Sequence, residues 1–269
     1  MSTITGAAPP RQILLDDYVP LLGAAGISEL RALGGLLKNA SVLMINSTAV
    51  GGGVAEILNR LIPMMEEIGL RVRWDVITGG NDFFEVTKAF HNALHGAPYQ
   101  ARPEHFEIFL AYNKQNRSRV EGDAEFRIIH DPQPVALIDA SDGRPGHWIW
   151  RCHIDLSRPN PAVWDFLEPY VLRYDGAIFS SPEFTRQLAI PQYLFYPSID
   201  PLSEKNRDLE PEVVRSIAER FGLDLKRPIL TQISRFDRLK DPVGVIRARR
   251  KSTRLNSSHI QKSRMPSSA

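Results

Sequence analysis

Residues 41–58 read SVLMINSTAVGGGVAEIL, which joins an apolar run to an amphipathic one through a glycine-rich turn. Its first part, SVLMIN at 41–46, is a short β-rich apolar run that predicts a strand. From Val54 onward, VAEILNRLIPMMEEIG places apolar residues at helical spacing and stops at Gly69, which predicts a helix. Three consecutive glycines separate the two. A strand, a glycine turn and a helix make the repeating unit of parallel sheets that are covered by helices.

The same alternation continues downstream. Strand-like runs recur in RVRWDVI, FRIIHD, HWIWRCHID and GAIFSS, and helical patterns occur in FFEVTKAFHNALHG, PEHFEIFLAYNKQNRSR and PAVWDFLEPYVL. We therefore predict an α/β fold of the Rossmann-like type, with a mostly parallel sheet covered on both faces. Before it, ISELRALGGLLKNA predicts a helix, and Leu14 to Pro20 is expected to form an extended arm.

Four segments are predicted along the chain. Residues 1–200 form an N-terminal Rossmann-like domain with its arm, and 201–226 form a proline-rich linker with a connecting helix. In 227–248 the run RPILTQISRFD predicts a strand, and DPVGVIRA predicts the beginning of a helix. We interpret these two elements as the truncated start of a second Rossmann-like domain. Residues 249–269 are the fourth segment. Apolar side chains of the third segment are expected to be exposed: Ile229, Leu230, Ile233 and Val245.

The formal net charge of +2 comes from the end of the chain. Residues 249–269 hold six of the 33 basic residues and none of the 31 acidic ones, which leaves 27 basic against 31 acidic residues, a net charge of −4, in the remainder. From Ser252 onward the sequence resembles a translated sequencing adapter, so we interpret 249–269 as a non-native tail, with a natural disordered basic tail as the alternative. Without the tail, no basic surplus remains to predict a nucleic-acid partner.

Bulk composition excludes other classes. The single cysteine, Cys152, rules out an internal disulfide framework. No apolar run approaches the length of a membrane span, and the N-terminus lacks a charged-then-apolar signal pattern. We therefore expect a cytoplasmic protein without a membrane partner, and the sequence leaves open a homo-oligomer.

The glycines Gly51, Gly52 and Gly53 have two readings. They either permit a tight structural turn, or they leave the free N–H groups of the following helix open to a phosphate or a sugar hydroxyl. The Walker-type phosphate loop is excluded because Gly-Lys-Ser/Thr is absent. A dinucleotide pattern starting at Gly51 would meet Glu56 where its third glycine belongs.

Polar side chains are predicted at the ends of two further strands. His130 and Asp131 close FRIIHD, and His153 lies near the end of HWIWRCHID. In open parallel sheets, ligands bind beyond the carboxyl ends of the strands, where a carboxylate and imidazoles can hold sugar hydroxyls. Each histidine taken singly is equally compatible with a structural role. Cys152 and His153, adjacent in one strand, are expected to point to opposite faces.

A third candidate lies in SRFDRLKDP. Arg235 closes the predicted strand, and Lys240 lies at the start of a helix that Asp241-Pro242 signals. Two such cations can converge on a diphosphate and stabilise negative charge on a departing nucleotide. A solvated surface cluster with Asp237 is the alternative.

Taken together, NSTAVGGGVAEILNRLIP, IIHDPQP, WRCHIDLSRPNP and ISRFDRLKDP resemble, in that order, the trehalose synthases among the retaining glycosyltransferases of the GT-B fold, family 4 type. The resemblance runs from about Ile13 to Ala248. It implies two Rossmann-like domains, the first holding a glucose acceptor and the second a nucleotide-glucose donor. It implies no cofactor, because the nucleotide sugar is a substrate, and no metal. The partners are then the sugar acceptor and the nucleotide sugar.

Residue roles follow from the same resemblance. It implies that Gly52 and Gly53, with Gly51 beside them, lie near the donor phosphate and the acceptor. It implies that Asp131 and His153, next to His130, hold the acceptor or the transferred glucose. Arg235 and Lys240 would grip the diphosphate and act in catalysis. The residues Pro132-Gln133 depart from related trehalose-phosphate synthases, which leaves the acceptor's phosphorylation state open.

Three rival interpretations remain open. The first is a trehalose phosphorylase, the second a non-catalytic sugar- or nucleotide-binding module, and the third, more distant, a dehydrogenase. Because the second domain is expected to be truncated, we also predict that this chain by itself is inactive. No Ser-His-Asp, Cys-His or zinc-type spacing occurs that would predict other chemistry.

Overall fold

The computed structural model describes residues 13–255 except 144, 207, 235 and 237, and it divides the chain into two compact units, Met1–Asn206 and Arg207–Ala269. The first unit contains a six-stranded sheet whose neighbouring strands are all parallel. The strands follow the order β2-β1-β3-β4-β5-β6. Their bounds are β1 Ser41–Asn46, β2 Arg71–Val76, β3 Phe126–His130, β4 His147–Arg151, β5 Gly176–Phe179 and β6 Gln192–Leu194.

Helices connect the strands. The α-helices of the first unit are α1 Val19–Leu36, α2 Gly53–Glu67, α3 Asn81–Leu94, α4 Pro103–Gln115 and α5 Pro161–Val171. Shorter 3-10 helices are η1 Leu15–Tyr18, η2 Asn116–Val120, η3 Val135–Ala140, η4 Pro182–Phe184 and η5 Glu204–Asn206. The second unit contains α6 Pro211–Arg220, η6 Arg238–Lys240 and α7 Pro242–Leu255. Among the helices of the described residues, none combines the length and the apolarity that a bilayer crossing needs.

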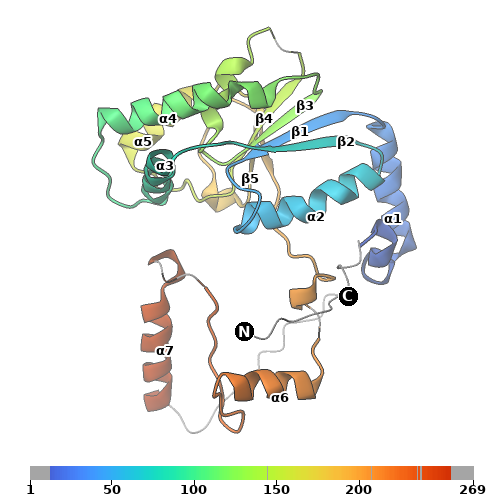
Figure 1. The fold of residues 1–269 in the computed structure, drawn as a ribbon, viewed down its shortest axis with the longest axis vertical. Helices are drawn as coiled ribbons and strands as arrows, with labels where there is room; N and C mark the ends of the chain where they lie inside the picture. Colours follow the sequence, from blue (N-terminus) through green and yellow to red (C-terminus); the bar gives the residue numbers. More distant parts are fainter. Residues whose placement is uncertain (1–12, 144, 207, 235, 237, 256–269) are drawn as a thin grey trace. The chain divides into compact units, whose positions relative to one another are not determined.

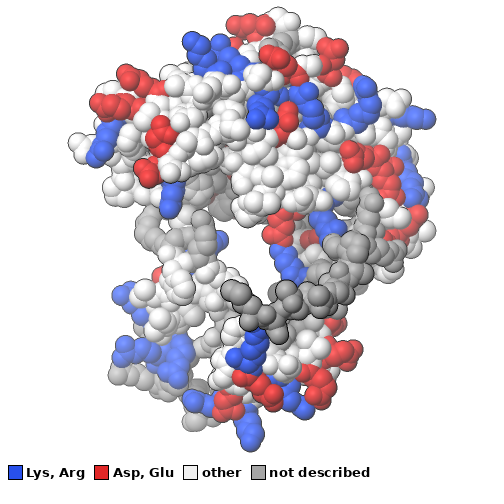
Figure 2. Space-filling view, in the orientation of Figure 1, with Lys and Arg blue, Asp and Glu red and all other residues white. Residues whose placement is uncertain are grey.

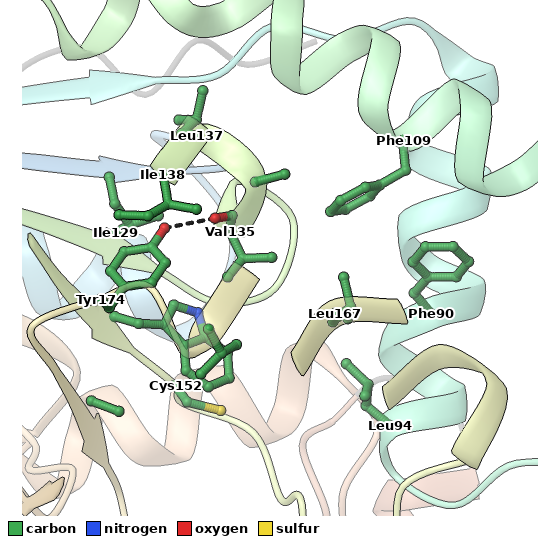
Figure 3. Close-up of a cluster of buried hydrophobic side chains, with 14 of the residues drawn as sticks. Phe90, Leu94, Phe109, Ile129, Val135, Leu137, Ile138, Cys152, Leu167 and Tyr174 are labelled. Carbon is green, nitrogen blue, oxygen red and sulfur yellow. Dashed lines mark hydrogen bonds between the residues drawn. The ribbon is translucent and has the colours of Figure 1, made fainter. Parts of the chain in front are cut away.

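The first unit has three layers, with the sheet between two sets of helices (Figure 1). Successive side chains of β1 point to opposite faces, so Val42 and Met44 join the cluster formed with α2. Leu43 and Ile45 join the larger cluster formed with α3, α4 and α5. Figure 3 shows part of that larger cluster, where the Tyr174 hydroxyl donates a hydrogen bond to the Val135 carbonyl oxygen at 2.7 Å. Near-continuous apolar strands such as SVLMIN are typical of sheets buried on both faces.

The predicted α/β fold with a parallel sheet is confirmed, while three local predictions need correction. The segment from Leu14 to Pro20 is not an extended arm, because Leu15–Tyr18 forms η1 and helix α1 starts at Val19. Leu15 and Tyr18 are buried in a cluster with Met64 of α2, and this packing favours a compact helical turn over an extended chain. Strand β6 was not predicted; it forms by pairing with β5.

The third correction concerns the second unit. The described residues of 227–237 form no strand, because a strand needs a neighbouring strand and none is present among the described residues of this unit. Its predicted helices do form, and α7 extends through residue 255, into the segment interpreted as a tail. The non-native origin of residues 249–269 stays a prediction. The expected exposure is confirmed for Ile229 (44%), Leu230 (70%), Ile233 (94%) and Val245 (38%).

Candidate functional site at the carboxyl edge of the sheet

The candidate site lies where the strand order of the sheet reverses. From β1 the chain moves outward to β2 on one side, and it then returns to β3 on the other side of β1. Such a switch point leaves a crevice beyond the carboxyl ends of the strands, where open α/β sheets bind ligands. The register pairs Ile45 with Ile129 and His130 with Arg151, so β1, β3 and β4 end at one edge.

The glycine loop leaves this edge from β1. Asn46, the last residue of the strand, is buried and holds the loop: its Nδ2 donates to the Thr48 carbonyl at 2.7 Å. Its Oδ1 accepts a hydrogen bond from Trp74 Nε1 of β2 at 2.9 Å. Gly51 has φ +71° and Gly52 has φ +130°, conformations that residues with a Cβ rarely adopt. The turn itself therefore requires these two glycines.

The glycine turn leaves open space beside the start of α2. A Cβ added at Gly51, Gly52 or Gly53 would meet no atom of the described residues within 4 Å. Gly52 is the N-cap and has no side chain to cap the helix, so the first N–H groups of α2 are not satisfied from within the helix. Gly53 has neither a positive φ nor a close neighbour that would explain a glycine. Its presence suits a ligand that approaches the backbone.

The structure brings His130, Asp131 and His153 together. The Nδ1 atom of His130 lies 3.0 Å from Nε2 of His153, and the two rings stack at an interplanar angle of 14°. The backbone N–H of His153 donates to Asp131 Oδ1 at 2.9 Å. Asp131 adopts φ 65°, a left-handed conformation that turns the chain directly after β3. Trp150 Nε1 donates to the Asp131 carbonyl at 3.0 Å and holds that turn in place.

Burial decides the charge state of this cluster. It lowers the pKa of His130 well below its usual value, with His153 and Arg151 adding to the effect. It lowers the pKa of His153 to about 3, again with a contribution from Arg151. The pKa of Asp131 is raised to about 6 by burial, although the His153 N–H and Arg151 oppose that shift. At pH 7 the site therefore presents neutral imidazoles and a largely ionised carboxylate, which can accept and donate hydrogen bonds with hydroxyl groups.

Arg151 is the residue of this site that the sequence interpretation missed. It ends β4, is 8% exposed, and donates from Nη2 to the Phe195 carbonyl at 2.8 Å and to Ser180 Oγ at 3.3 Å. Its Nη1 is buried without a hydrogen-bond partner among the described residues. Burial lowers its pKa. The available signal was its position: Arg151 immediately precedes Cys152-His153 at a predicted strand end.

Cys152 and His153 lie just after β4, which ends at Arg151, and not inside the strand from which their opposite orientation was predicted. Cys152 is fully buried in the larger core cluster, and burial raises the pKa of its thiol. A protonated, inaccessible thiol is a poor nucleophile. Across the described part of the chain, no group of three or more His, Cys, Asp or Glu side chains could hold a metal ion.

The two predicted cations belong to the second unit. Arg235 lies outside the described residues. Lys240 is exposed, at the end of η6, and its carbonyl accepts a hydrogen bond from Gln232 Nε2 at 2.5 Å. The predicted helix signal is confirmed, because Asp241 Oδ1 accepts the Gly244 N–H at 3.0 Å at the start of α7. Of the predicted site residues, the first unit holds the three glycines, His130, Asp131 and His153.

Charge on the surface is mixed. Figure 2 shows Lys and Arg side chains intermingled with Asp and Glu over the visible face of the first unit. Among the ion pairs of the first unit, Arg60 pairs with Asp200 at 2.8 Å, and Lys205 pairs with Glu56 in the first turn of α2. These two ion pairs hold the segment after β6 against α2, the helix that directly follows the glycine loop.

Comparison with known proteins shows the family of the chain. Residues 44–186, more than half of the chain, match the family described as "Trehalose synthase, N-terminal domain". Trehalose synthases of Pyrococcus horikoshii and Rubrobacter xylanophilus are each 43% identical over 244 residues, which is 88% of this chain. A trehalose synthase of Thermococcus litoralis is 43% identical over 241 residues.

The chain spans 58% of the length of the Pyrococcus and Thermococcus relatives and 59% of the Rubrobacter relative. Among solved structures, one described as "Trehalose-6-phosphate from E. coli bound with UDP-2-fluoro glucose" aligns with 67% of this chain and 54% of its own. Its TM-score is 0.48 and its sequence identity is 15%. On the family match and the relatives, the chain belongs to the trehalose synthase family, and its residues 44–186 correspond to the N-terminal domain of that family.

Proposed function

We propose that this chain is the acceptor-side part of a retaining glucosyltransferase that forms trehalose from a nucleotide-glucose donor and glucose. Family membership supports the reaction class. The observation that carries the proposal is the cluster at the switch point, where the Asp131 carboxylate is fixed by the His153 N–H at 2.9 Å beside two neutral imidazoles. Such a set supplies the hydrogen-bond donors and acceptors that suit hydroxyl-rich ligands.

Each residue then has a role. Asp131 and His153 hold sugar hydroxyls, and the open amides of α2 beyond Gly52 face the donor phosphate or the acceptor. Arg235 and Lys240 stabilise the diphosphate as it departs. The acceptor attacks on the face that the nucleotide leaves, and the leaving phosphate takes the acceptor proton. This route needs no protein nucleophile, in keeping with the buried thiol of Cys152.

The first test uses the chain as it is. Because it spans 58% of the length of its relatives, we expect the purified 269-residue chain to form trehalose at least about a hundredfold more slowly than the full-length enzyme, since much of the donor would not be positioned. Trehalose formation from nucleotide-glucose and glucose is measured by chromatography. Turnover by the chain equal to that of the full-length enzyme would contradict this prediction.

The same samples separate the rival functions. Trehalose cleavage by the full-length enzyme that requires inorganic phosphate and yields glucose 1-phosphate would identify a phosphorylase instead. Calorimetric binding of trehalose or nucleotide-glucose by a full-length protein that shows no turnover in either direction would identify a binding module. Both outcomes would overturn the proposed reaction.

The glycine loop supplies a second test, with matched variants. Gly53→Ala is expected to leave the melting temperature unchanged or slightly raised, because its φ is ordinary and alanine favours a helix. Its methyl group would nevertheless occupy the open space over the amides, and we expect the KM for the nucleotide-glucose donor to rise about tenfold in the full-length enzyme. Gly52→Ala is expected instead to destabilise the fold by about 1–3 kcal/mol, because φ +130° strains any residue with a Cβ. A wild-type KM for Gly53→Ala would show that the donor does not approach the backbone at Gly53.

A further inference from the structure

His130 is buried at the carboxyl end of β3, with 4% of its surface exposed. Its ring makes one hydrogen bond among the described residues, from Nδ1 to Nε2 of His153 at 3.0 Å. The other ring nitrogen, Nε2, is buried and has no hydrogen-bond partner among those residues. His153 itself is only partly buried. A ligand can therefore reach His153 more readily than the buried His130.

Two neutral imidazoles joined at 3.0 Å share a single proton between the facing nitrogens, because one must donate and the other accept. If His153 donated, His130 would carry its own proton on Nε2 and would bury an N–H without an acceptor. If His130 donates from Nδ1, its buried Nε2 is only a lone pair. Buried N–H groups without partners are rarer than buried acceptors without partners, so the second arrangement is favoured.

We propose that His130 is a positioning residue, which donates from Nδ1–H to His153 Nε2 and thereby holds His153 in the tautomer with its proton on Nδ1. His153 then offers an N–H donor at Nδ1 to an oxygen of the bound sugar. This proposal rests on the proposed function, because it identifies the hydrogen-bond donor for a hydroxyl or ring oxygen of the bound sugar. The Asp131 carboxylate beside it supplies the complementary acceptor.

The surroundings support a single neutral arrangement. The two rings are held nearly parallel, at 14°, and His153 is also tied through its backbone N–H to Asp131 Oδ1. Arg151 ends the neighbouring strand in register with His130 and, together with burial, opposes the addition of a proton to either ring. The Asp131 carboxylate accepts the backbone N–H of His153 and is not among the charges that shift the pKa of either imidazole. The hydrogen bond between the rings thus persists as one between neutral groups at pH 7.

The test compares two variants of the 269-residue chain labelled with ¹⁵N-histidine. His130→Asn places an amide donor close to the position of Nδ1, whereas the side chain of His130→Phe fills the same space and cannot donate. Long-range ¹H–¹⁵N correlation spectra at pH 7 report the tautomer of each of the seven histidines, and the His153 signals are assigned by their loss in His153→Gln. We expect the Nδ1–H form of His153 in the wild type and in His130→Asn, and a mixture of both tautomers in His130→Phe.

Several outcomes would overturn the proposal. A wild-type His153 protonated on Nε2 would do so, as would a folded His130→Phe that keeps the pure Nδ1–H form. If His130→Phe does not fold, as judged by circular dichroism, the wild-type and His130→Asn spectra still decide the tautomer. In the full-length enzyme, we expect His130→Phe to lower kcat/KM about tenfold, with His130→Asn close to wild type. If the full-length enzyme forms no trehalose at all, the NMR result for the His153 tautomer still holds. Failure of the proposed function can therefore be told apart from failure of this proposal.

Discussion

Asp131→Asn is expected to abolish trehalose formation by the full-length enzyme while making the fold more stable at pH 7. The variant keeps an oxygen that can accept the His153 N–H, but it removes the negative charge that the proposed sugar contact uses. Its backbone is compatible, because asparagine tolerates the left-handed region and Asn39 of this chain adopts φ 66°. Function and stability should therefore move in opposite directions.

The stability gain follows from the pKa of Asp131, which is about 6 in the folded protein against 3.8 for an exposed aspartate. Below pH 3.8 the carboxyl is protonated in both the folded and the unfolded state. Between 3.8 and 6 the folded state binds more protons, so the free energy of unfolding falls as pH rises. Above pH 6 the burial of the charge has its full cost, on the order of 1–3 kcal/mol. Asparagine removes that cost.

Chemical unfolding of wild type and Asp131→Asn at pH 4, 5, 6 and 7 measures this effect. The advantage of the variant should grow with pH up to about pH 6–7 and nearly disappear at pH 4. Asp142→Asn is the matched control, because the Asp142 side chain is 91% exposed, and the same substitution there should change neither stability nor turnover appreciably. Equal or lower stability of Asp131→Asn at pH 7 would contradict the assigned burial, and retained turnover would contradict the assigned role.

Arg235→Ala and Lys240→Ala, made separately in the full-length enzyme, are each expected to lower kcat by about 10²–10³-fold. The reason is that a fixed cation matters most when negative charge develops on the departing diphosphate. Lys240 is exposed, and its truncation leaves the Asp241 cap of α7 intact. The melting temperature of the Lys240→Ala variant should therefore hardly differ from that of the wild type. Steady-state rates with a nucleotide-glucose donor provide the measurement.

Lys226→Ala is a suitable control for these variants, because Lys226 is an exposed cation of the same unit without a proposed role. It should retain wild-type kcat and the wild-type KM for the donor. If both Arg235→Ala and Lys240→Ala also retain wild-type kcat, these cations do not act on the leaving group. A rise in KM alone would show that they bind the ground state and the transition state equally.

The sequence alone determined the features that local patterns encode. The strand at 41–46, the glycine loop and helix α2 were predictable because side-chain period and glycine conformation act within a few residues. The start of α7 at Asp241-Pro242 was predictable for the same reason. Placing Asp131 and His153 at a shared edge needed only the rule that parallel strands end together.

Tertiary structure alone decided the features that depend on distant partners. Strand β6 exists because β5 lies beside it, whereas the β-rich run at 227–237 has no neighbouring strand among the described residues and forms none. The segment at Leu15–Tyr18 is helical because it packs against α2. Likewise, the burial of His130 and the place of Arg151 depend on contacts across 23 and 44 residues of sequence. Pairing and burial join residues that are remote along the chain, so no local period or motif carries that information.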